Sequence, residues 1–127
     1  MANISFGYDM EPSIIPVDYD VLLGNYITIS RGKLDGISYL LETKIDEENY
    51  KVYYQFFVVV DNTCFIMIPE DFGDWYDIET FNKLLDNILT KRKLQEIFAV
   101  VDGGQYVDII FGNPKVIEQL FKKYKLD

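Results

Sequence analysis

The sequence predicts an α+β fold: a mainly antiparallel sheet, built from a meander and a C-terminal hairpin, packed by two helices. Three observations predict it. Successive strand-like segments are joined by short turns, two later segments have helical spacing, and strands and helices do not alternate regularly. The chain has 127 residues, a common length for one folding unit. We therefore expect residues 1–127 to form a single α+β domain.

The N-terminal third begins with a strand. Ile4, Phe6 and Tyr8 alternate with polar or small residues, the period of a half-buried strand. Residues 10–24 contain two prolines and are expected to be irregular, with room for a brief helical turn. Residues 26–31 fit a strand, which ends at a glycine-bounded turn.

Residues 37–45 fit two structures. Apolar residues alternate along them, and a subset also has the spacing of a helical face. We favour a strand because Gly36 is costly inside a helix and because residues 46–49 resemble a turn.

The clearest strand covers residues 50–60. It is rich in Tyr, Phe and Val, which fit a pleated and half-buried surface. Both of its faces are apolar at one end, so it is expected to be central in its sheet. Residues 61–62 form a turn and residues 63–68 return as the next strand. Residues 96–101 and 105–111 form a second hairpin around a glycine pair.

Two segments show helical spacing. Asp77 is a predicted N-cap for a helix over about residues 77–90. Asn113 caps a second helix over about residues 114–125, with Pro114 at its first position. The apolar stripe of this C-terminal helix is expected to be buried; it consists of Val116, Ile117, Leu120, Phe121 and Tyr124.

The composition excludes several chemistries. The chain has no histidine and one cysteine, so Ser-His-Asp and Cys-His arrangements cannot form and a zinc site lacks ligands. No phosphate-binding loop or dinucleotide-binding motif is present. Asp18 and Asp20 could flank a hard cation, but no further ligand is spaced to complete the site, and we favour a solvated turn. We expect no metal, no cofactor and no enzymatic activity, although a two-carboxylate glycosidase needs no other residue type.

Cysteine content and charge suggest the compartment and the partners. Cys64 lies in an apolar run and is expected to be a small buried hydrophobe. With no possible intramolecular disulfide, no secretory signal and no membrane span, the chain is expected to be cytoplasmic and to avoid membranes. The net charge is -9. The two basic clusters fall at predicted helix ends, where they complement the helix dipole, so no nucleic acid is expected as a partner.

Negative charge is concentrated in the middle of the chain. No base occurs between Lys51 and Lys83. Within this gap an acidic-aromatic segment joins a strand to a helix, and its candidate partner-binding residues are Glu70, Asp71, Phe72, Asp74, Trp75, Tyr76 and Asp77. Aromatic anchors among acids suit a basic protein surface.

Two alternatives remain open for this segment. Tyr76 and Phe81 have the spacing of a hydrophobic staple, and Phe72 or Trp75 could fold back over the edge of the core. A weaker second group of acids and tyrosines lies near the N-terminus, where a polar loop is the plainer interpretation; it consists of Tyr8, Asp9, Glu11, Asp18, Tyr19 and Asp20.

A small, acidic, aromatic-rich and histidine-free α+β chain resembles the bacterial immunity proteins, which neutralise the toxins of interbacterial competition systems. The resemblance implies a protein-binding inhibitor of one cognate toxin, often a basic nuclease, with residues 70–77 supplying the anchors. One alternative is a phage-type inhibitor that mimics DNA with two long rows of acids. Another is a non-catalytic binding subunit that meets its partner at an exposed sheet edge. The sequence leaves the oligomeric state open.

Overall fold

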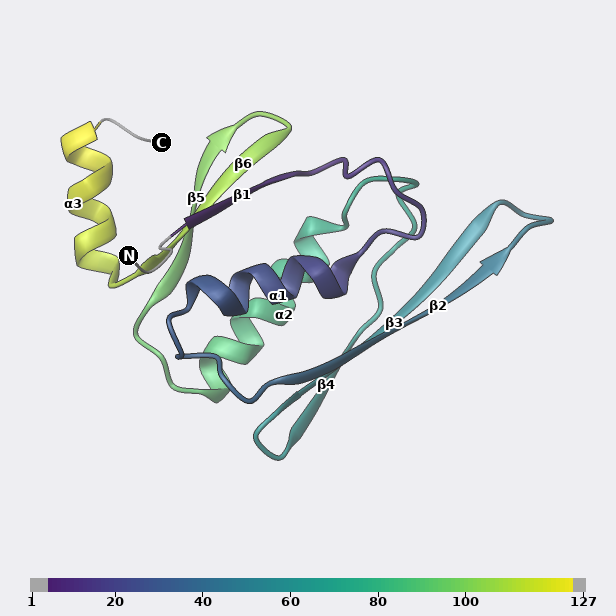
Figure 1. The fold of residues 1–127 in the computed structure, drawn as a ribbon, viewed down its shortest axis with the longest axis horizontal. Coiled ribbons are helices and arrows are strands. Elements are labelled where there is room, and N and C mark those ends of the chain that lie inside the picture. Colours follow the sequence, from purple (N-terminus) through teal and green to yellow (C-terminus); the bar gives the residue numbers. More distant parts are fainter. Residues whose placement is uncertain (1–4, 125–127) are drawn as a thin grey trace.

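The computed structural model describes residues 5–124, with the backbone alone at residues 102 and 103. It contains two three-stranded antiparallel sheets and three helices (Figure 1). This confirms the α+β class and the antiparallel pairing. In chain order the elements are β1 (Ser5–Asp9), α1 (Tyr19–Ile29), β2 (Ser38–Asp46), β3 (Lys51–Val60), β4 (Thr63–Met67), α2 (Ile78–Lys91), β5 (Ile97–Gly103), β6 (Tyr106–Gly112) and α3 (Pro114–Tyr124).

The strands divide into two sheets where the sequence suggested one. The predicted meander forms the sheet β2-β3-β4 with β3 central, and the C-terminal hairpin forms the sheet β1-β6-β5. The second sheet gains its third strand from the other end of the chain, because β1 pairs with β6 and places Phe6 opposite Ile109. A pairing across a hundred residues leaves no local pattern in the sequence.

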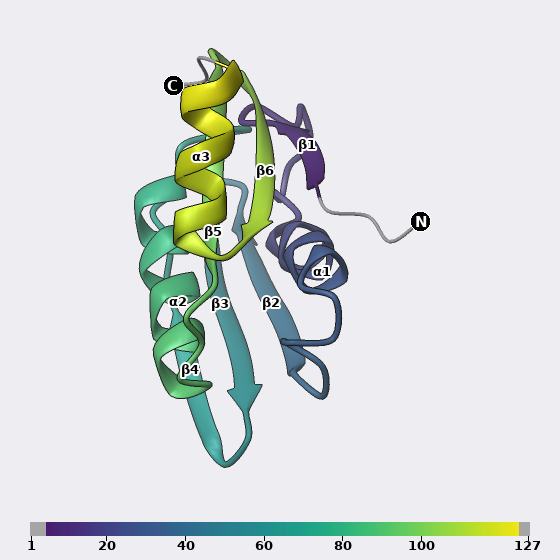
Figure 2. The same cartoon turned by 90° about the vertical axis from the view of Figure 1, so that its left-hand side faces the viewer.

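Helices α1 and α2 lie between the two sheets (Figures 1 and 2). Aromatic side chains of α1 contact both sheets. The ring of Tyr26 meets Phe6 and Phe98 edge-on, each at 4.9 Å between centroids. On the other side the ring of Tyr19 meets Tyr54 of β3 at 5.5 Å. The layers thus share one continuous hydrophobic core.

The predicted strand over residues 26–31 is wrong, because most of this segment belongs to helix α1. The buried residues of α1 recur at helical spacing; they are Tyr19, Leu22, Leu23, Tyr26 and Ile29. Gly24 and the nearby aromatic and β-branched residues obscure this pattern. A Cβ at Gly24 would lie 3.1 Å from the hydroxyl of Tyr39 on β2, so the glycine allows the helix to approach the sheet.

The predicted burial of the α3 stripe is also wrong. Ile117 is buried, but Val116, Leu120 and Tyr124 are exposed, and Figure 1 shows α3 at one end of the molecule. Helical spacing identifies the apolar side of a helix, but it does not tell whether the body covers that side. The predicted cap is confirmed, since the Lys115 amide donates to Asn113 Oδ1 at 2.9 Å.

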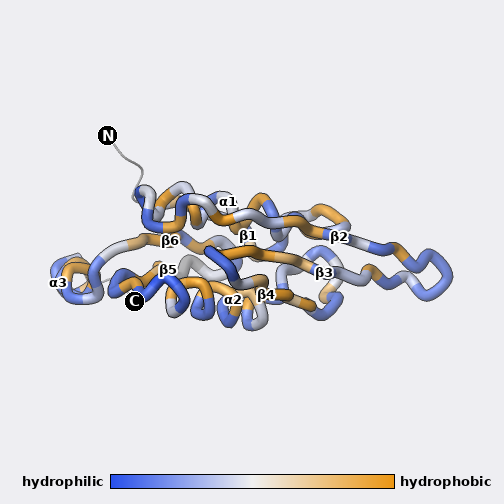
Figure 3. Tube along the Cα trace, turned by 90° about the horizontal axis from the view of Figure 1, so that it is seen from below, coloured by the Kyte–Doolittle hydropathy of each residue, from blue (hydrophilic) through white to orange (hydrophobic). Residues whose placement is uncertain are grey.

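Cys64 is exposed, so the expectation of burial is wrong. It lies on β4 opposite Val59 of β3, and this face of the sheet points away from the helices. The β2–β3 hairpin extends beyond the rest of the chain, and its tip is hydrophilic (Figure 3). None of the helices within residues 5–124 has the length and apolar character to cross a bilayer.

Candidate protein-binding surface

The acidic-aromatic segment forms a tight turn between β4 and α2. At its tip the Trp75 amide donates to the Phe72 carbonyl at 3.3 Å, and the two residues form an isolated antiparallel bridge. Gly73 has φ of +69°, a conformation that glycine adopts without steric cost. Phe72 is 51% exposed and Trp75 is 38% exposed, so both rings reach solvent at the tip.

Two carboxylates fix the ends of this turn. Asp71 accepts hydrogen bonds from the amides of Val52 at 2.8 Å and Gly73 at 2.9 Å. Asp77 accepts from the Glu70 amide at 2.9 Å, and from the Thr80 amide and hydroxyl at 3.2 and 2.7 Å. The predicted N-cap is therefore confirmed. Charge-assisted bonds of this kind hold a loop in one conformation.

Buried tyrosines support the turn from below. The hydroxyl of Tyr76 donates to Asp18 at 2.5 Å, and the Asp77 amide donates to the hydroxyl of Tyr19 at 2.8 Å. The ring of Tyr19 lies against both Tyr76 and Phe81, with centroids 5.4 and 6.3 Å apart. Burial raises the pKa of Tyr19 and of Tyr76. Both hydroxyls are therefore neutral at physiological pH.

The N-terminal acidic group lies beside the same turn. The Tyr76 amide donates to the carbonyl of Met10 at 3.1 Å. The carboxyl of the next residue, Glu11, lies close to the Asp74 carboxyl and to the indole of Trp75. Partial desolvation raises the pKa of Glu11, and the neighbouring Asp74 carboxyl raises it further. The carboxyls of Glu11 and Asp74 are thus held close together beside the exposed ring of Trp75.

The fold revises the role expected of the seven candidate residues. Tyr76 and Asp77 are buried, and Asp71 is held by two backbone amides, so these three position the turn. The other four candidate residues remain available to contact a partner, and two acids of the N-terminal segment lie on the same surface. We name this set the acidic knuckle; it consists of Asp9, Glu11, Glu70, Phe72, Asp74 and Trp75.

Replacing Glu11 by glutamine is expected to raise the melting temperature at neutral pH and leave it unchanged at low pH. The pKa of Glu11 is raised on folding, so its ionisation opposes folding. This cost sets in as the pH rises from the unfolded-state pKa of about 4.3 towards the folded value, and it persists above it. Thermal melts of wild type and variant at a pH below and a pH above these two pKa values measure the difference in melting temperature. Glu47→Gln, at the exposed β2–β3 turn, is the control, and an equal shift at both pH values would contradict the assignment.

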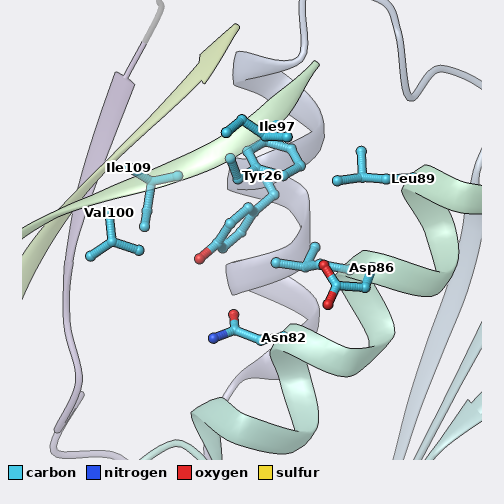
Figure 4. A pocket seen from close by; sticks show the side chains of 9 residues that line it. Tyr26, Asn82, Asp86, Leu89, Ile97, Val100 and Ile109 are labelled. Atoms are coloured by element: carbon cyan, nitrogen blue, oxygen red, sulfur yellow. The ribbon is translucent and has the colours of Figure 1, made fainter. Parts of the chain in front are cut away.

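A groove of about 370 Å³ lies between α2 and β5, with Tyr26 of α1 at its floor (Figure 4). Its walls are mainly apolar, and its polar side chains besides Tyr26 are Asn82 and Asp86. A glycosidase needs two carboxylates facing each other across the bound sugar. This groove supplies one carboxylate, that of Asp86.

Within residues 5–124 no group of three acidic or cysteine side chains is placed to hold a metal ion.

Comparison with known proteins found no family model that matches the chain, no similar curated protein and no similar solved structure.

Proposed function

We propose that this chain is a non-catalytic, protein-binding inhibitor of the immunity type, which neutralises a cognate toxin by covering its basic surface with the acidic knuckle. The observation that carries the proposal is the exposure of Phe72 and Trp75 beside the Glu11 and Asp74 carboxyls. Such rings would fill hollows in the toxin, while the acids would face its cations.

The charge of the knuckle favours a basic partner. Desolvation raises the pKa of Glu11, and the charges of Asp74 and Asp9 raise it further. An arginine or lysine placed between these carboxyls would relieve the repulsion. Complementary charge also steers the encounter and speeds association. The net charge of -9 acts in the same direction at long range.

The anchored turn lowers the cost of binding. Asp71 and Asp77 hold the loop through backbone amides, so little chain entropy remains to be lost when a partner docks. Preorganised loops gain affinity in this way. Buried aromatic anchors usually carry a large share of the binding energy at such interfaces.

Growth rescue tests the proposal. The toxin encoded next to the gene for this chain is expressed in a sensitive host with and without the chain. Wild-type chain is expected to restore growth. The variant Trp75→Ala with Asp74→Asn is expected to lose rescue, because it removes a central ring and one knuckle charge. Absence of a neighbouring toxin gene, or full rescue by the variant, would refute the proposal.

Association kinetics with the same toxin test the electrostatic part. Removing two knuckle charges with Glu11→Gln and Asp74→Asn is expected to slow association by about tenfold at low salt and to flatten its salt dependence. The matched control, Glu47→Gln with Glu48→Gln, removes two exposed charges from the β2–β3 turn. Equal slowing by both pairs would mean that total charge, and not the knuckle, governs the encounter.

A further inference from the structure

The sheet β2-β3-β4 has an apolar face that no part of residues 5–124 covers. In its register Leu40 lies opposite Phe57 and Phe57 lies opposite Ile66, while Val59 lies opposite Cys64. Directly paired residues share one side of a sheet. Leu40 is 57% exposed and Ile66 is 58% exposed. We name these five residues the outer face.

The outer face differs from the usual exposed side of an antiparallel sheet, which alternates polar residues with the buried ones. Phe56 and Val58 of β3 are completely buried on the inner side. Their neighbours Phe57 and Val59 are also apolar and point outward. A central strand that is apolar on both sides is typical of a sheet covered on both sides.

The size of the patch suits an interface. Tyr53 and Ile68 are both more than half exposed and extend the outer face towards the start of β3. Together these side chains present on the order of 500 Å² of apolar surface, near the upper end of what a monomer exposes in one patch. With their polar rims, two such faces approach the ~1,600 Å² total that a standard protein interface buries.

The charges on this face indicate which partner fits. Glu42 lies opposite Gln55, and Lys44 lies opposite Tyr53. Neither Glu42 nor Lys44 takes part in an ion pair within the described residues. Asp46 and Lys51 form the next pair on this side. The face thus carries two charges of each sign, although the whole chain has a net charge of -9. A basic partner gains little here, whereas a two-fold interface requires one surface that complements itself.

We propose that two copies of this chain associate through their outer faces and stack the β2-β3-β4 sheets against each other. Stacked sheets lie about 10 Å apart and interdigitate their side chains. Leu40, Phe57 and Ile66 form the dry centre of this dimer, and Glu42 and Lys44 lie at its rim. The centre of this dimer shares no residue with the acidic knuckle, and its formation can be measured without a toxin.

Sedimentation equilibrium from low-micromolar to submillimolar concentration tests the dimer. Wild-type chain is expected to approach twice its 14.9 kDa mass as concentration rises. Leu40→Lys with Ile66→Lys is expected to remain monomeric. Val21→Lys is the matched control, because Val21 is 56% exposed on α1, away from this face, and it should dimerise like the wild type.

Cys64 provides a second readout that needs no substitution. It is the only cysteine of the chain and is exposed on the outer face. Its alkylation rate per molecule is expected to fall as wild-type concentration rises, and to stay constant in the Leu40→Lys, Ile66→Lys variant. A wild-type chain that stays monomeric with constant thiol reactivity overturns the proposal. A lysine variant that still dimerises overturns it as well, because the contact must then lie elsewhere.

Discussion

Replacing Phe81 by alanine is expected to lower the free energy of unfolding by about 3–5 kcal/mol. Phe81 is completely buried in the first turn of α2. Its ring lies 5.4 Å from that of Tyr26 and 6.3 Å from that of Tyr19, both on α1. Truncation opens a cavity where the two helices meet between the sheets, and rigid neighbouring rings fill such a cavity poorly.

Urea denaturation of the Phe81→Ala variant measures this loss. Phe72→Ala is the matched control, because it removes the same ring from a position that is half exposed. Its effect is expected to stay within about 0.5 kcal/mol. Similar losses for the two variants would mean that Phe72 packs into the core and does not serve as an exposed anchor.

Much of the fold could be predicted from local patterns. Alternation in β2 and β3 and the turn after Val60 identify the meander, and the spacing from Asp77 to Ile88 identifies α2. Each of these elements carries its signal within its own ten to fifteen residues. For such elements local preference and final structure agree, as expected of a sequence that folds reliably.

The elements that were predicted wrongly or missed depend on residues far away along the chain. The last turn of helix α1 was predicted as a strand because Tyr26, Ile27 and Ile29 favour strands locally. The helix is buried by Phe6, Tyr54 and other residues that lie far away along the chain. The partner of β1 lies about a hundred residues away. These outcomes reflect tertiary contacts that override local propensity.

The candidate site shows the same division. The sequence places a surface turn at residues 70–77, and the structure has it there. The sequence does not distinguish Asp77, which is buried as a helix cap, from Asp74, whose carboxyl lies beside that of Glu11. That distinction depends on Tyr19 and Met10 docking beneath the turn, and no spacing rule connects those residues to it.

Replacing Asp77 by alanine is expected to lower the free energy of unfolding by about 2–4 kcal/mol at neutral pH. The change removes the cap of α2, for which about 0.5–2 kcal/mol is typical. It also leaves the part-buried Glu70 amide and Thr80 hydroxyl without their acceptor, and a donor that loses its partner out of reach of water costs about 1–3 kcal/mol. Chemical denaturation measures the loss, and the emission of Trp75, the single tryptophan of the chain, reports whether the knuckle loosens.

The pH dependence of this loss follows from the pKa of Asp77. Burial alone would raise that pKa, but the hydrogen bonds from Glu70 and Thr80 lower it below its ordinary value. A lowered pKa means that the stabilisation is present above the unfolded-state value of about 3.9 and is lost as the pH falls through the folded value. The difference between wild type and Asp77→Ala should therefore shrink in acid. Glu79→Ala, an exposed change in the same helical turn, should cost far less, and a comparable loss would show that general helix electrostatics, and not the cap, holds the turn.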